Sequence, residues 1–71
     1  MILMIQIVDN STGQQTVIQT TWVEVDSMFM AQLRADAIAE AAPAWLGGDT
    51  IRILQEGRVL KSRGLGSAWP L

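Results

Sequence analysis

The sequence predicts a small α+β fold in which one helix packs on a mainly antiparallel four-stranded sheet, in the order ββαββ. Two stretches, 2–25 and 50–63, contain runs of residues that favour strands and are each interrupted by turn residues, as in hairpins. The segment between them, 27–42, is rich in helix-forming Ala, Met, Leu, Gln, Arg and Glu. No repeat or interdomain linker is visible in the sequence. We therefore expect a single domain over 1–71, with a loop-like C-terminal tail at 64–71.

The N-terminal hairpin begins with an almost continuous apolar run at 2–8, which is typical of a strand with much of both faces buried. The turn residues of 9–13 follow, and the next run, which ends at Val25, is rich in Val, Ile, Thr and Trp. Ile18 and Trp22 are expected on its less apolar face. The other face is expected to be more apolar and to carry four residues: Val17, Thr21, Val23 and Val25.

A helix is expected over 27–42, capped by Asp26 or Ser27, because either side chain can accept the free backbone amides of the first turn. Pro43 should end it, since proline has no amide to donate. Apolar residues that recur at intervals of three and four should pack on the sheet: Phe29, Met30, Leu33, Ala37, Ile38 and Ala41. On another side, three residues spaced by four should form an acidic ridge at the surface: Gln32, Asp36 and Glu40.

The C-terminal hairpin is expected to pair a strand at 50–55 with a strand at 58–63 through a tight turn at 56–57. The composition of 64–67 is that of a loop. An apolar tail follows at 68–71, where a proline blocks a regular ending.

The chain carries little charge for its size, since 49% of its 71 residues are hydrophobic and 17% are charged, against about 25% charged in typical soluble domains. A domain this small buries only about 60% of the surface of its unfolded chain, so it should need more polar residues, not fewer. We therefore expect another chain to cover part of its exterior.

His, Cys and Tyr are missing from the sequence, which removes most of the side chains used for acid–base catalysis, nucleophilic attack and metal binding. Asp36 and Glu40 lie one helical turn apart, but two carboxylates on an exposed helix face fall short of the six or more oxygens that hard cations prefer. We expect a protein that is not an enzyme and that holds no metal or cofactor.

Charge is divided along the chain: residues 1–49 hold six acids and one base, for a formal charge of −5, and residues 50–71 hold four bases and one acid, for +3. The two halves either neutralise each other in the fold or form surfaces of opposite sign. A basic hairpin can follow phosphates, but four bases opposed by an acidic half would neutralise few of them. Nucleic acid is therefore disfavoured as a partner.

Trp and Arg are over-represented among the residues that dominate interface energies. We expect partner contacts from the acidic helix ridge, the arginines of the second hairpin and the later tryptophans: Gln32, Asp36, Glu40, Trp45, Arg58, Arg63 and Trp69. Two alternatives stay open. Trp22 and Trp45 can be ordinary core or lid residues, and Trp69 can dock on its own domain.

The order hairpin, helix, hairpin resembles the ubiquitin-like β-grasp arrangement. Residues 4–7, leading through 12–13 into a Thr- and Val-rich strand, carry the likeness, as do residues 51–60, which look like that family's third and fourth strands. The chain lacks the family's final central strand and ends in Trp-Pro-Leu at 69–71 instead of Gly-Gly. The resemblance therefore implies the fold without conjugation or sulfur-carrier activity.

In its small size, acidity and lack of catalytic residues, the chain is similar to small phage proteins that block host machinery, anti-CRISPR proteins among them. That likeness implies a non-enzymatic protein–protein interaction module, a phage-encoded inhibitor that binds a host nucleoprotein complex and sterically blocks nucleic-acid access. The alternative is a homo-oligomeric structural or assembly protein whose apolar face pairs with itself. No stretch approaches the roughly 20 apolar residues of a membrane span, and 1–8 lacks the basic leader of a signal peptide. We expect a cytoplasmic protein, in the host cytoplasm if it is phage-encoded.

Overall fold

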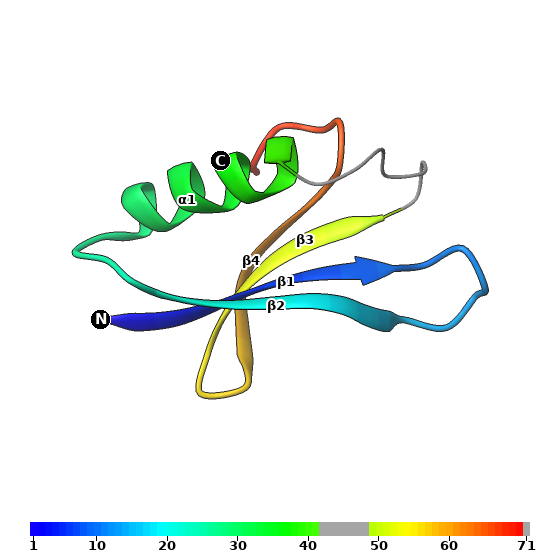
Figure 1. Cartoon of the computed structure of the whole chain (residues 1–71), viewed down its shortest axis with the longest axis horizontal. Helices are drawn as coiled ribbons and strands as arrows, with labels where there is room; N and C mark the ends of the chain where they lie inside the picture. Colours follow the sequence, from blue (N-terminus) through cyan, green and yellow to red (C-terminus); the bar gives the residue numbers. More distant parts are fainter. Residues whose placement is uncertain (42–48, 71) are drawn as a thin grey trace.

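The fold is known from a computed structural model that describes residues 1–41 and 49–70. Five elements follow one another along the chain: β1 (Ile2–Asp9), β2 (Thr16–Glu24), α1 (Met28–Ala41), β3 (Thr50–Gln55) and β4 (Arg58–Gly64). The strands form one antiparallel sheet in the order β2-β1-β3-β4, and α1 lies across one face of it (Figure 1). The predicted ββαββ fold is confirmed.

Each hairpin has a turn that its sequence suits. The Glu56-Gly57 turn places both residues at positive φ, 52° and 80°, as a two-residue hairpin turn of type I′ requires. The first hairpin has a longer loop, in which the Ser11 amide donates to Asp9 Oδ1 at 2.8 Å and Gly13 adopts a φ of 79°. These local contacts explain why the turn residues predicted both hairpins correctly.

The two outer strands each contain a bulge. Ile18 is the extra residue in β2 and Leu60 is the extra residue in β4, where the pairing with the inner strand shifts by one. On the N-terminal side of its bulge, β2 places Val17 opposite Val8 and not on the face that carries Val23. The expectation that Val17 and Val23 share one face is therefore wrong, because the extra residue inverts the alternation.

Helix α1 begins where the sequence provides a cap. Ser27 Oγ accepts the backbone amide of Met30 at 3.2 Å, so Ser27 is the N-cap. The first helical residue is Met28, one residue later than predicted, and the described part of the helix ends at Ala41. The expected stop at Pro43 and the glycines after it lie outside the described residues.

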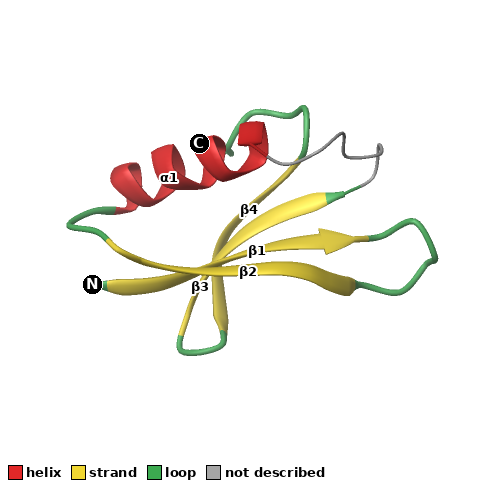
Figure 2. Ribbon diagram, in the orientation of Figure 1, coloured by secondary structure: helices red, strands yellow, loops and turns green. Residues whose placement is uncertain are grey.

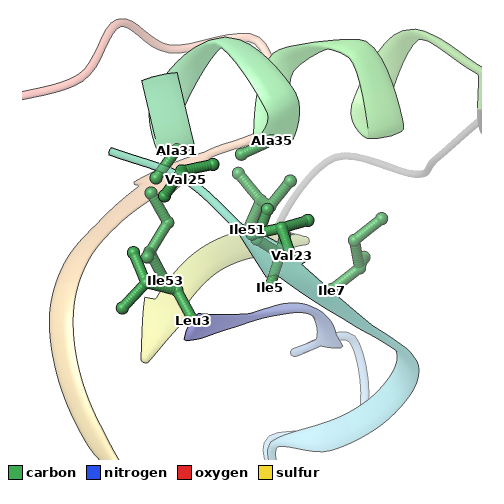
Figure 3. Close-up of a cluster of buried hydrophobic side chains, with 9 residues drawn as sticks. All are labelled: Leu3, Ile5, Ile7, Val23, Val25, Ala31, Ala35, Ile51 and Ile53. Carbon is green, nitrogen blue, oxygen red and sulfur yellow. The ribbon is translucent and has the colours of Figure 1, made fainter. Parts of the chain in front are cut away.

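The helix packs on the sheet through its smallest side chains (Figure 3). Ala31 and Ala35 have no exposed surface, and Met28, Ile38 and Ala39 flank them. Seven residues complete the core under these alanines, six of them in strands and one, Val25, just after β2: Leu3, Ile5, Ile7, Val23, Val25, Ile51 and Ile53.

The predicted packing face of the helix is wrong except at Ile38. Phe29, Met30 and Leu33 lie on the outside of α1, and Ala37 and Ala41 are also exposed. The physical reason is space: branched strand residues already fill the gap between helix and sheet, so the close approach of the two layers requires a helix face of methyl groups.

Candidate interaction surface

The sheet face opposite α1 is covered by no described helix or strand, and we call it the open face (Figure 2). Because side chains alternate along a strand, the pairing brings four residues into one line across all four strands, which we call the apolar row: Trp22, Met4, Leu54 and Val59. Trp22 is 66% exposed and Val59 is 46% exposed, whereas Leu54 between them is only 5% exposed. The row is therefore an apolar stripe with exposed ends, a half-buried Met4 and a buried Leu54.

A second line crosses the open face beside the apolar row, and its residues are polar: Thr20, Gln6, Arg52 and Ser62. Arg52 Nε donates to Gln6 Oε1 at 2.9 Å. This contact gives the guanidinium a neutral amide as its hydrogen-bond partner. With Glu24 at the end of β2, the open face carries one base and one acid, so it is neutral as well as partly apolar.

Three of the predicted contact residues meet on the other side of the sheet. Asp36 Oδ1 accepts hydrogen bonds from Arg63 Nη2 at 2.7 Å and from Trp69 Nε1 at 2.9 Å. The Arg63 guanidinium also lies over the Trp69 ring, 5.0 Å from its centroid. This Asp36–Arg63–Trp69 cluster joins α1, β4 and the C-terminal segment.

The cluster holds the C-terminal segment against the domain. Arg63 Nη1 donates to the backbone carbonyls of Gly64 and Ser67, both at 3.2 Å, and Trp69 packs against the hydrophobic core. Of the two alternatives for Trp69, the structure shows docking on its own domain. A role of the cluster residues in binding a partner stays a prediction.

The other predicted contact residues are not brought into that cluster by any described contact. Gln32 is half-buried on α1, Glu40 is exposed in the last turn of α1, and Arg58 is exposed at the start of β4. Trp45 lies outside the described residues. Since Asp36 is paired with a base, the predicted acidic ridge is reduced at its middle position.

The sequence reasoning placed Trp22 on the less apolar face of its strand but did not select it as a contact residue. The signal that could have selected it is architectural. A single helix can cover only one face of a four-stranded sheet, so large apolar side chains of the other parity are left without a layer above them. Phe29 was expected on the packing face of the helix and was not selected as a contact residue either, but it is 66% exposed on α1.

Two carboxyl groups meet where β1 ends and β3 begins. Asp49 is only 5% exposed, and within the described part of the chain its Oδ1 has no hydrogen-bond partner. Burial raises the pKa of Asp49 above its ordinary value of 3.8, and the charge and hydrogen bond of Asp9 raise it further. The pKa of Asp9 is lowered, chiefly because the Ser11 amide donates to it.

The two carboxyl groups give no evidence of a metal site. Among residues 1–41 and 49–70, no group of three or more His, Cys, Asp or Glu side chains could hold a metal ion. The pair can instead share a proton, with Asp49 as the donor, because two adjacent carboxylates resist ionising together. We interpret it as a structural contact between the two inner strands.

Comparison with protein-family models, with curated proteins and with solved structures finds no match to this chain. The resemblances to the β-grasp arrangement and to phage inhibitors therefore stay predictions. In the part of the chain that the structure describes, no helix has the length and apolar character needed to cross a membrane.

Proposed function

We propose that this chain is a non-catalytic protein-binding module that docks a larger protein on its open face. The exposure of Trp22 carries the proposal. A tryptophan on a strand buries a large area in a complex and loses little conformational entropy, which is why this residue type dominates interface energies. Met4 and Leu54 continue the apolar row across the inner strands, next to Trp22.

The charges of the molecule favour a protein over a nucleic acid as the partner. Arg63 is paired with Asp36 and Arg52 is hydrogen-bonded to Gln6, so two of the four bases of the C-terminal half are already engaged. Nucleic-acid affinity rises with the number of phosphates that a protein neutralises. A neutral, apolar row is the surface that a protein partner fits better.

We propose a phage-encoded inhibitor that docks on a host nucleoprotein complex and obstructs its access to nucleic acid. Because the Asp36 carboxylate is paired, obstruction by the bulk of the docked domain accounts for inhibition better than imitation of a nucleic acid by acidic side chains does.

Site-specific photo-crosslinking tests the docking surface. A benzophenone amino acid is placed at position 22 or, in a matched control, at position 29, since Trp22 and Phe29 are both 66% exposed but lie on opposite sides of the molecule. In a lysate of the source cell or its host, we expect position 22 to capture one larger protein and position 29 to capture none. Capture should be lost when excess unlabelled protein is added and retained when excess Trp22→Ala protein is added.

Two results would contradict the proposal. Equal capture from both positions would show that exposure alone directs the reaction, and capture from position 29 alone would move the docking surface to α1. If the captured protein carries nucleic acid, a competition assay with that nucleic acid tests the inhibitor form separately.

A further inference from the structure

The two edge strands of the sheet differ in how well they resist pairing with another strand. β4 carries three bases, Arg58, Lys61 and Arg63, and it bends at the Leu60 bulge. Charged side chains and bulges are the usual protections of an edge. β2 is longer, contains no Gly or Pro, and has one charged residue, Glu24, at its end.

The outer side of β2 is accessible. Among the described strands it is paired with β1 alone, and most of its side chains are exposed, among them Ile18 and Trp22. From Gln19 to Glu24 the pairing with β1 is regular, because the bulge lies before this segment. No described strand lies beside the backbone groups on the outer side of this segment, so they form a template for a further antiparallel strand.

We propose that β2 pairs antiparallel with β2 of a second copy of this chain, within the segment 19–24, to form one continuous eight-stranded sheet. A two-fold axis perpendicular to the sheet places both helices on one side and joins the two open faces on the other. The two apolar rows then meet near the axis through their Trp22 ends. The inference goes beyond the docking proposal and does not depend on it.

A second copy fits this edge because the contact is self-complementary. In a two-fold antiparallel pairing, the C-terminal half of β2 in one copy lies opposite the N-terminal half of β2 in the other. The single charge of Glu24 therefore faces an uncharged segment of the second copy. Pairing β4 with its own copy would instead bring three bases of each strand together. Pairing β2 with β4 would leave one free edge of each kind and produce open filaments.

Sedimentation velocity over a wide range of concentrations, from micromolar to millimolar, tests the inference. We expect a monomer–dimer equilibrium without larger species. Thr20→Glu places a second acid on the face of β2 that carries Glu24, so that acids of the two copies come together twice in each dimer, and it should weaken association at least about tenfold, or about 1.4 kcal/mol. Ser62→Glu is the matched control, because Thr20 and Ser62 end the same polar row and Ser62 lies on the β4 edge. It should leave association unchanged.

Amide hydrogen exchange of the unmodified protein provides a second measurement that needs no variant. Exchange in 19–24 should slow as concentration rises, while exchange in β4 stays constant. A monomer at all concentrations, equal effects of the two glutamate variants, or protection that grows in β4 would overturn the inference. Capture from position 22 by a monomer would overturn the dimer and leave the docking proposal standing. A dimer without capture of a larger protein would overturn the docking proposal and leave the dimer standing.

Discussion

The two faces of the sheet are built by the same alternation of side chains, yet they meet opposite conditions. On the covered face, Leu3, Ile5 and Ile53 are sealed under two alanines of α1. On the open face, Trp22 and Ile2 remain largely in water. Apolar character in a strand therefore does not decide burial, because burial depends on whether another layer lies above that face.

The open face is nevertheless not a bare strand surface. Val8 is 1% exposed and Leu54 is 5% exposed, although neither belongs to the cluster under the helix. They lie on inner strands and are shielded by their neighbours on both sides. The inner strands therefore supply a small second apolar layer, and the unshielded residues are those of the outer strands and the strand ends.

The largest difference in stability between the two faces is expected when isoleucine is replaced by alanine in β1, once on each face. Ile5→Ala removes a fully buried side chain and should lower the free energy of unfolding by about 2–5 kcal/mol, because it leaves a cavity under the helix. Ile2→Ala, at a position on the open face, should change it by about 0.5 kcal/mol. Urea unfolding followed by circular dichroism measures both. Similar losses at the two positions would show that the open face is buried in solution.

The two sides of α1 should differ in how well they tolerate a larger side chain. Ala35→Leu should lower the free energy of unfolding by about 1–3 kcal/mol, because the added atoms have no space between α1 and the sheet. Ala37→Leu makes the same chemical change on the exposed side of the same helix and should lie within about 0.5 kcal/mol of the parent. If the two variants unfold at the same urea concentration, α1 does not pack through its alanines.

The smallest effect is expected at the carboxyl pair beside the covered face. Because the pKa of Asp49 is raised, its contribution to stability is fully present below pH 3.8 and is lost as pH rises through its folded pKa. Asp49→Asn cannot ionise, so it should be more stable than the parent at pH 7, with a difference that shrinks as pH falls toward 3.8.

Asp9 changes the same curves in the opposite direction. Its pKa is lowered, so its stabilisation is present above pH 3.8 and is lost below it in both proteins. Urea midpoints between pH 3 and pH 7 (about one pH unit apart) follow both effects. Glu40→Gln removes the same charge from an exposed helix position and is the control. A parent that is more stable than Asp49→Asn at pH 7 would refute the interpretation of the pair.

The strands and the helix were predictable because their signals are local. Turn residues, the Ser27 cap and runs of β-branched residues act on neighbours in the chain, and each element lies within a residue or two of its expected bounds. The candidate site was less predictable. Trp69 and Arg63 were selected as partner contacts from residue type alone, and their contact with Asp36 depends on three segments that meet only in the fold.

What the amino-acid pattern settled in advance was the order of elements and the presence of one helix for four strands. Which side of α1 faces inward, the inversion of Val17 by the bulge, and the exposure of Trp22 were settled by packing. Periodicity identifies an apolar stripe without measuring the space available to it. Here the branched residues of the sheet had already filled that space, so the helix turned its alanines inward and its larger side chains outward.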